Sequence, residues 1–256
     1  MKHLNMLLFF LFSHAHSSVF NTLLEKYPHS FLINFDKGYA IYQLMKDVHD
    51  LLTHFKINYW IQGGTLLGAL RHGGLMWWDD DLDINIDKDD FICLIKLRPL
   101  LEQLGYILVF TDIPSQFYIT TQKYSYNAPV LDIFLTRREH NTTRYILHDW
   151  TRNKEAIYMY DYELYPLQLY TFGEFKVYGP YDPYVYLQCG FGNNYMNNVT
   201  LYNHHLYMEG CKEHYHCSLE DIPAQYRNCV PLYKPLQNRV KELLEEQSSS
   251  THKINT

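Results

Sequence analysis

Apolar side chains recur at intervals of three or four residues near the start of the chain, as at Leu44, Val48 and Leu51. This spacing places them on one face of a helix, so we expect an amphipathic helix over residues 39–55. A short apolar run over residues 57–61 then predicts a buried strand. The first recognisable elements are therefore a helix and the strand that follows it.

A glycine turn separates this strand from a second helix. Gly63 and Gly64 form the turn, and the hydroxyl of Thr65 is expected to cap a helix that runs through Arg71. The two glycines after His72 end that helix. Glycines at a helix N-terminus allow close approach of the backbone to a phosphate group.

Apolar and acidic residues alternate beyond this helix. Leu82 and Ile84 alternate with Asp81, Asp83 and Asn85. A period of two predicts a strand with one apolar face and one polar face.

One more helix and three more strands are predicted downstream. Asp89 is expected to cap a helix over residues 91–97, which is interrupted at Pro99, resumes and ends at Gly105. The expected strands span residues 106–110, 117–121 and 130–135. This order of elements indicates an α+β domain with a mixed sheet.

The second half has a weaker pattern. It predicts a strand over residues 172–178, a short helix over 182–189 and a charged helix over 236–247 that leads into a disordered polar tail. No linker divides the chain, so we expect a single domain over residues 39–235, followed by the helix and tail at 236–256.

The N-terminus resembles a targeting segment. Lys2 and His3 precede the apolar run over residues 7–12, and Ser13-His14-Ala15 gives a small-residue cleavage pattern. We expect a signal peptide over residues 1–15, or alternatively a short anchor, and no membrane span in the mature chain. The predicted location is the secretory pathway, in the Golgi lumen or outside the cell.

Two further patterns fit that location. Asn141 and Asn198 begin triplets that accept N-linked glycans. In an oxidising lumen the three cysteines nearest the C-terminus are candidates for disulfide bonds. These are Cys211, Cys217 and Cys229.

Composition limits the possible partners. The chain has 256 residues and a formal net charge of −6, so it lacks the basic surface of a nucleic-acid-binding protein. Its 24 tyrosines gather in the second half, where they are either half-exposed packing residues or rings that stack on sugars.

The acidic strand is the strongest candidate for chemistry. Asp81 and Asp83 point to the same face and repel each other unless a cation lies between them. Asp132 stands alone in an apolar strand, where a buried carboxylate needs either that same cation or a salt bridge with Arg137 or Arg138. The pattern predicts a metal site on these three acids, and the other reading of the acidic run is a solvated turn.

Phosphate contacts are predicted close to these acids. Gly63, Gly64 and Thr65 offer backbone groups at a helix N-terminus, while Arg71 and Lys123 offer positive charge. For both cations the alternative is an ordinary structural or surface role.

These motifs resemble those of a known family. Gly63-Gly64-Thr65-Leu66-Leu67-Gly68-Ala69-Leu70-Arg71-His72, followed by Trp78-Asp79-Asp80-Asp81-Leu82-Asp83-Ile84, resembles the signature of the LicD family. That family includes bacterial phosphorylcholine transferases and the animal proteins fukutin and fukutin-related protein. Val130-Leu131-Asp132-Ile133-Phe134 resembles its later acidic strand. Residues 181–195 resemble its C-terminal motif loosely, since Cys189-Gly190 replaces the usual aromatic-glycine pair.

The resemblance implies a fold, a reaction and a cofactor. The fold is the polymerase-β-type nucleotidyltransferase fold. The reaction transfers a phosphorylated alcohol, such as phosphocholine or ribitol phosphate, from a CDP-linked donor to a glycan hydroxyl. Mg²⁺ or Mn²⁺ is implied at Asp81, Asp83 and Asp132, and one of these acids, Asp132 above the others, is expected to accept the proton of the acceptor hydroxyl.

A second cluster has two readings. Histidines and cysteines concentrate between residues 204 and 217, where they either bind zinc or, as we favour, contribute cysteines to disulfides. The members are His204, His205, Cys211, His214, His216 and Cys217.

Two other functions fit the acidic pattern. One is a metal-dependent glycosyltransferase of the Asp-x-Asp type, although few residues precede Asp81 for its nucleotide-binding region. The other is a secreted non-catalytic protein that binds glycans, against which the presence of all three acids argues.

Overall fold

A seven-stranded sheet lies at the centre of the computed structural model, which describes residues 18–112, 116–122, 125, 128–139, 141–145, 158–201 and 214–254. Its strands are β1 (Tyr59–Ile61), β2 (Leu82–Asp87), β3 (Ile107–Phe110), β4 (Gln116–Thr120), β5 (Val130–Glu139), β6 (Thr142–Tyr145) and β7 (Tyr158–Tyr160). Two hairpins stand apart from the sheet: β8 (Gln168–Phe172) with β9 (Phe175–Gly179), and β10 (Asn198–Leu201) with β11 (Tyr215–Ser218).

Helices surround this sheet. The α-helices are α1 (Val19–Lys26), α2 (Phe35–His54), α3 (Gly63–His72), α4 (Phe91–Lys96), α5 (Arg98–Gln103), α6 (Asp161–Leu164), α7 (Tyr184–Phe191) and α9 (Arg239–Ile254). The 3₁₀ turns are η1 (Lys88–Asp90), η2 (Leu219–Asp221) and η3 (Ala224–Tyr226). In the part of the chain that is described, no helix has the length and apolar character needed to cross a membrane.

The sheet is mixed. Its main path runs β1-β2-β5-β4-β3, and β6 extends it from the second half of β5 to β7. Strands β2 and β5 are parallel, whereas all other neighbours are antiparallel. This arrangement agrees with the expected α+β architecture and places two strands that carry acidic residues side by side.

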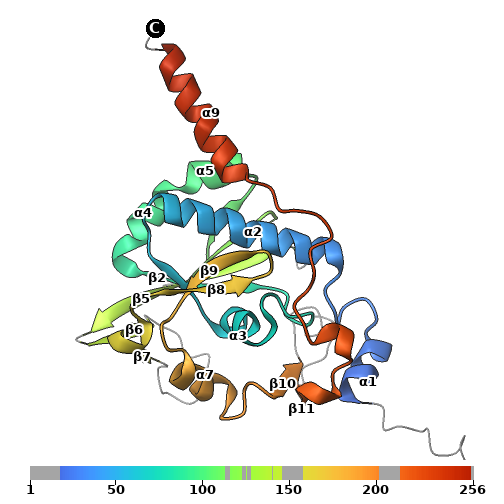
Figure 1. The fold of residues 1–256 in the computed structure, drawn as a ribbon. Helices are drawn as coiled ribbons and strands as arrows, with labels where there is room; N and C mark the ends of the chain where they lie inside the picture. Colours follow the sequence, from blue (N-terminus) through green and yellow to red (C-terminus); the bar gives the residue numbers. More distant parts are fainter. Residues whose placement is uncertain are drawn as a thin grey trace, which may run out of the picture.

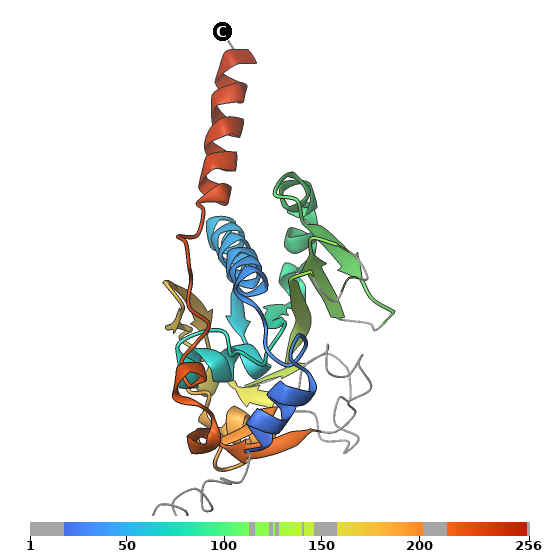
Figure 2. The same cartoon turned by 90° about the vertical axis from the view of Figure 1, so that its right-hand side faces the viewer.

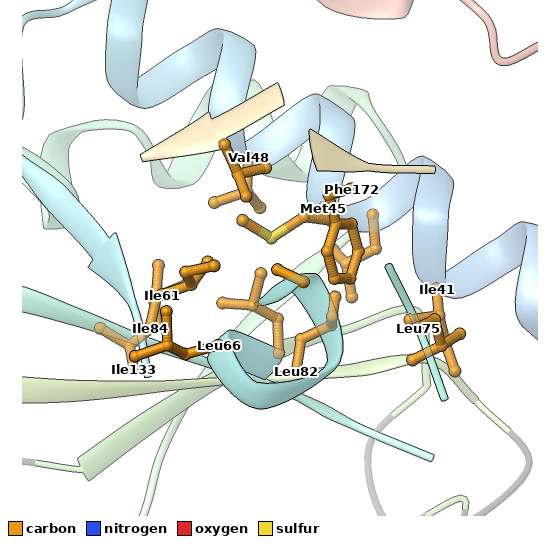
Figure 3. Close-up of a cluster of buried hydrophobic side chains, with 14 of the residues drawn as sticks. Ile41, Met45, Val48, Ile61, Leu66, Leu75, Leu82, Ile84, Ile133 and Phe172 are labelled. Atoms are coloured by element: carbon orange, nitrogen blue, oxygen red, sulfur yellow. The ribbon is translucent and has the colours of Figure 1, made fainter. Parts of the chain in front are cut away.

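Helix α2 covers one face of the sheet (Figure 1). Its side chains Met45 and Val48 gather with Ile61, Ile84 and Ile133 of the sheet in one apolar cluster (Figure 3), and all of these residues are buried. Because side chains alternate along a strand, the residues between these core positions face the other way. The acidic positions of β2 and β5 therefore point away from α2.

The C-terminal segment is fastened to α2 by a buried polar cluster. The carboxylate of Asp47 is fully buried and accepts hydrogen bonds from Tyr106 (2.8 Å) and Gln43 (2.9 Å). Arg239, at the start of α9, lies 3.1 Å from the same carboxylate. Beyond this anchor α9 projects from the body of the protein (Figure 2).

Most elements of the first half match the sequence prediction. The first predicted helix is α2, the interruption at Pro99 separates α4 from α5, and Gly105 ends α5 with φ +82°. The acidic strand is β2, and its apolar residues are buried as expected.

Two predicted caps are wrong. Helix α3 begins at Gly63, two residues before Thr65, and the Thr65 hydroxyl instead accepts a hydrogen bond from the backbone N–H of Asp83 at 2.8 Å. The turn before α4 is capped by Asp87, whose carboxylate accepts from the N–H of Asp89 at 2.9 Å. In both cases a residue of β2 makes the hydrogen bond: Asp83 donates to the Thr65 hydroxyl, and the carboxylate of Asp87 accepts from Asp89.

Two predictions for the second half need correction. Residues 172–178 form the turn and second strand of a hairpin, because Gly173 adopts φ +65° and reverses the chain. The expected disordered tail continues α9 to Ile254, with the hydroxyls of Ser248 and Ser249 bonded to the carbonyls of Leu244 and Glu245, each at 2.9 Å.

The packed unit also extends past the predicted domain of residues 39–235. Phe20 from α1 and Val240 from α9 are buried in the same core as α2. Helix α1 was not predicted, and residues 1–15, the expected signal peptide, lie outside the described residues.

The buried cluster at Asp47 yields a stability prediction. Arg239→Ala leaves a fully buried carboxylate without its cation, and we expect the free energy of unfolding to fall by about 3 kcal/mol in urea titrations. Lys241→Ala is the matched control, since Lys241 pairs with Glu245 only on the exposed surface of α9 and contributes about 0.5 kcal/mol or less. Equal effects of the two changes would contradict a structural role for the buried pair.

Candidate functional site

Three carboxylates converge on the face of the sheet opposite α2. The parallel register of β2 and β5 sets Asp83 directly beside Asp132. Asp81 lies two residues before Asp83 and points to the same side. One oxygen from each of the three side chains lies within 4.8 Å of the others, and all three residues are half-buried. The structure thus brings together the acids that the sequence predicted as one site.

The N-terminus of α3 closes against this acidic cluster. A Cβ atom added at Gly63 would lie 2.7 Å from an oxygen of Asp83, and one added at Gly64 would lie 2.6 Å from an oxygen of Asp79. Gly63 also adopts φ +52°, where side chains are strained. The two glycines are required here because carboxylates occupy the space that a side chain would need.

Electrostatic repulsion dominates the cluster. Burial, followed by the charges of Asp81, Asp132 and Asp79, raises the pKa of Asp83 well above its ordinary value. A hydrogen bond from the backbone N–H of Gly64 acts in the opposite direction. The positive end of the α3 dipole also stabilises the charged carboxylate and so lowers the pKa of Asp83. A cation among these oxygens would relieve the remaining repulsion.

Nearby cations are engaged elsewhere. Lys37 forms a buried ion pair with Asp80 at 3.3 Å, which gives Asp80 a structural role. Arg137 pairs with Glu139, and Arg138 lies 3.3 Å from Asp161. The two arginines considered as alternative partners of Asp132 thus pair with other acids.

Arg71 lies at the far end of α3. Its guanidinium donates to the backbone carbonyls of Tyr195 (2.7 Å) and Asn198 (2.8 Å) and to the ring of His72. Burial lowers its pKa to about 10, so it remains charged at neutral pH. In this structure Arg71 holds the segment before β10, and its predicted contact with phosphate stays a prediction.

Some predicted site residues lie outside the described part of the chain. These are Lys123, Cys211, His204 and His205. Asn141 and Asn198 are both exposed, and their glycosylation stays a prediction.

The expected disulfides stay a prediction, because Cys211 lies outside the described residues. Among the described residues, Cys217 and Cys229 are not bonded to each other. Cys217 is held in the ladder between β10 and β11, while Cys229 lies beside the hydroxyl of Tyr42. The two therefore occupy separate environments.

Two tyrosines near the acids escaped the sequence prediction. Tyr118 of β4 is in register with Asp132 and so lies on the same face of the sheet. The hydroxyl of Tyr186, on α7, accepts a hydrogen bond from the N–H of Gly63 at 3.1 Å. Only the loose motif at residues 181–195 hinted at the second contact, because a link between α7 and α3 depends on the tertiary fold.

Comparisons with known proteins agree with these motifs. The family described as LicD/FKTN/FKRP, nucleotidyltransferase domain, matches residues 56–182, a range that contains all three acids. An uncharacterized protein of Rickettsia prowazekii is 41% identical over 180 residues, which make up 69% of this chain and 63% of that protein. The chain therefore spans less than two thirds of this relative.

Two shorter matches have named activities. The lipopolysaccharide cholinephosphotransferase LicD of Haemophilus influenzae is 46% identical over 43 residues, or 17% of this chain and 16% of that protein. The human ribitol 5-phosphate transferase FKRP is 39% identical over 51 residues, or 20% of this chain and 10% of that protein. Both names describe transfer of a phosphate-containing group.

Removal of one acidic charge tests the repulsion. In metal-free buffer at pH 7, Asp83→Asn should raise the free energy of unfolding, because burial and the neighbouring carboxylates disfavour a negative charge at this position. The gain should shrink as the pH falls. The pKa of Asp83 is raised in the folded protein, so this carboxyl becomes protonated in wild type and loses the charge that the substitution removes. Asp89→Asn, at an exposed acid, is the control. A loss of stability in Asp83→Asn under these conditions would contradict the repulsion.

His72 gives a separate pH dependence. Burial, and then the charge of Arg71, lower the pKa of His72 from 6.5 to about 4. As the pH falls from 6.5 towards 4 the unfolded chain takes up a proton that the folded protein does not, so the free energy of unfolding decreases, by up to about 3 kcal/mol. Urea titrations of wild type and His72→Gln across this range should show the decrease only in wild type. Parallel pH curves for the two proteins would rule out His72 as its source.

Proposed function

Because this chain belongs to the LicD family, we propose that it is a phosphotransferase that moves a phosphorylated alcohol from a CDP-linked donor to a glycan hydroxyl. The metal of the proposed reaction is Mg²⁺ or Mn²⁺. The observation that carries the proposal is the convergence of Asp81, Asp83 and Asp132 beside the glycine-rich start of α3. The choice of CDP rests on the family resemblance.

The donor atoms suit the proposed ion. Three carboxylates offer hard oxygen ligands, which Mg²⁺ and Mn²⁺ prefer over the thiolates and imidazoles that suit zinc. The pKa of Asp83 is raised by burial and then by the charges of Asp81, Asp132 and Asp79, and a cation would offset both effects. The residues present therefore fit a divalent cation.

Each part of the chain has a role in this proposal. Asp81, Asp83 and Asp132 would hold the ion, while Gly63 leaves space for the carboxylate of Asp83 and Gly64 leaves space for that of Asp79. When bound, such an ion neutralises negative charge on transferring phosphate groups.

Asp132 is the proposed acceptor of the proton released by the attacking hydroxyl. It lies at the centre of the sheet face, between Asp83 on β2 and Tyr118 on β4. A carboxylate in that position has one neighbour that repels its charge and one that offers a phenolic ring. The charge of Asp83 favours proton uptake by Asp132.

The fold type and the cellular location belong to the proposal as well. A polymerase-β-type nucleotidyltransferase fold is supported by a mixed sheet in which acidic residues from neighbouring strands share one face. A secretory location is supported by Asn141, an exposed asparagine that begins a glycosylation triplet.

Calorimetric titration of nucleotides tests the function. CDP-choline, CDP-ribitol, CDP-glycerol and UDP-sugars are each titrated with and without Mn²⁺. We expect one CDP-alcohol to bind in the presence of Mn²⁺ and to lose more than about tenfold in affinity, or 1.4 kcal/mol, in Asp132→Asn.

Asp89→Asn serves as the matched control, because Asp89 is an exposed acid in the turn after β2. It should bind the donor as wild type does. Binding of a UDP-sugar alone would favour a glycosyltransferase. A folded protein that binds no nucleotide would favour a non-catalytic protein.

A further inference from the structure

Helix α7 turns an aromatic face to solvent. Tyr184 is 55% exposed and Phe191 is 37% exposed, whereas Tyr186 and Leu187 are buried against the protein. Seven residues separate the two exposed rings, so they lie on the same stripe of the helix, about 10 Å apart along its axis. The helix therefore offers two rings in a row on one accessible surface.

A cavity opens at the C-terminal end of α7. It has a volume of about 410 Å³ and is lined by residues from this end of the helix and from the β10–β11 hairpin. These residues are Gly190, Phe191, Asn198, Thr200, His216 and Cys217. Thr200 and His216 lie 3.2 Å apart, within hydrogen-bond distance. A ring beside neutral hydrogen-bonding groups matches a sugar, which has apolar C–H faces and hydroxyls.

The chain segment that forms α7 and leads into β10 has no charged side chain, and the charge beside it comes from Arg71, which donates to the backbone carbonyl of Asn198. From Pro183 to Asn203 there is no Asp, Glu, Lys, Arg or His, although these residues are common elsewhere in the chain. Five asparagines fall in the same stretch, at positions 193, 194, 197, 198 and 203. A neutral surface of amides and rings complements a neutral polyhydroxylated ligand. It does not complement an anionic nucleotide or nucleic acid.

The cavity is connected to the acidic site through α3. At one end of α3, the Tyr186 hydroxyl accepts from Gly63 beside Asp83. At the other end, Arg71 donates to the carbonyl of Asn198, in the wall of the cavity. Eight residues separate Gly63 from Arg71, a rise of about 12 Å. A short oligosaccharide has the length to reach from the cavity to the acids.

We propose that the exposed face of α7 and the cavity at its end bind the acceptor glycan when Asn198 carries no glycan, with Phe191 stacked on a sugar ring and Thr200 and His216 bonded to its hydroxyls. This inference rests on the proposed function for the identity of the acceptor. The donor occupies the acids at one end of α3, and the acceptor approaches along α7 from the other end.

Binding to an array of immobilised neutral mono- and oligosaccharides tests the site. The protein is produced in a bacterial host that does not glycosylate Asn198, so that the cavity stays open. We expect wild type to bind at least one saccharide, and we expect Phe191→Ala and Thr200→Val each to weaken that binding at least tenfold.

Two variants serve as controls, and unfolding midpoints verify that every variant is folded. Met196→Ala removes an exposed side chain from the same uncharged stretch without touching the cavity, and it should bind as wild type does. Asp83→Asn should also keep saccharide binding, because the acids hold the donor. If Phe191→Ala does not fold, Thr200→Val decides the question.

The inference is overturned if both cavity variants bind within twofold of wild type, or if wild type binds none of the saccharides. It is also overturned if Asp83→Asn abolishes saccharide binding while Phe191→Ala does not. Calorimetry with the CDP-alcohols and Mn²⁺ separates the two proposals. If wild type binds a saccharide but no CDP-alcohol, the phosphotransferase proposal alone is refuted. If wild type binds a CDP-alcohol but no saccharide, the glycan-site proposal alone is refuted.

Discussion

The parallel pairing of β2 with β5 is the constraint on which the site depends. It sets Asp83 beside Asp132, at a cost in repulsion that the protein tolerates. The register is held from the opposite face, where Leu82, Ile84 and Ile133 are fully buried beneath α2. A slip of one residue would turn the acids into the core and the apolar residues outward. The hydrophobic core thus enforces an arrangement that the carboxylates alone would oppose.

Helix α3 transmits this arrangement to the rest of the molecule. Its first turn meets β2 through Gly63 and through the Thr65 hydroxyl, and its last turn holds the segment before β10 through Arg71. Arg71 is half-buried and donates to the carbonyls of Tyr195 and Asn198, so it links the last turn of α3 to this segment. One short helix therefore fixes the spacing between the acidic cluster and the uncharged surface of α7.

The sequence predicted the acids well because their signal is local. Alternation with apolar residues identifies the face of a strand, and a lone Asp132 in an apolar strand stands out without any knowledge of the fold. The same reasoning recovered α2, the break at Pro99 and the mixed sheet.

Predictions failed where a residue's partner lies far away in the chain. Thr65 resembles a helix cap until the backbone N–H of Asp83 on β2 donates to its hydroxyl. The contact of Tyr186 with Gly63 spans 123 positions and has no local signature. The sequence predicts disorder for the polar tail because the run of serines there has no apolar periodicity. In the structure these serines lie in α9, and the hydroxyls of Ser248 and Ser249 donate to carbonyls of the preceding turn.

The central claim is that Asp81, Asp83 and Asp132 together hold a single divalent cation. Titration of Mn²⁺ followed by electron paramagnetic resonance tests it directly, because the signal of free Mn²⁺ diminishes as the ion binds. Wild type should take up one Mn²⁺ per chain, and Asp132→Asn should take up none over the same concentration range. Uptake by Asp132→Asn with the affinity of wild type would contradict the claim, since the ion would then lie outside the register of β2 and β5.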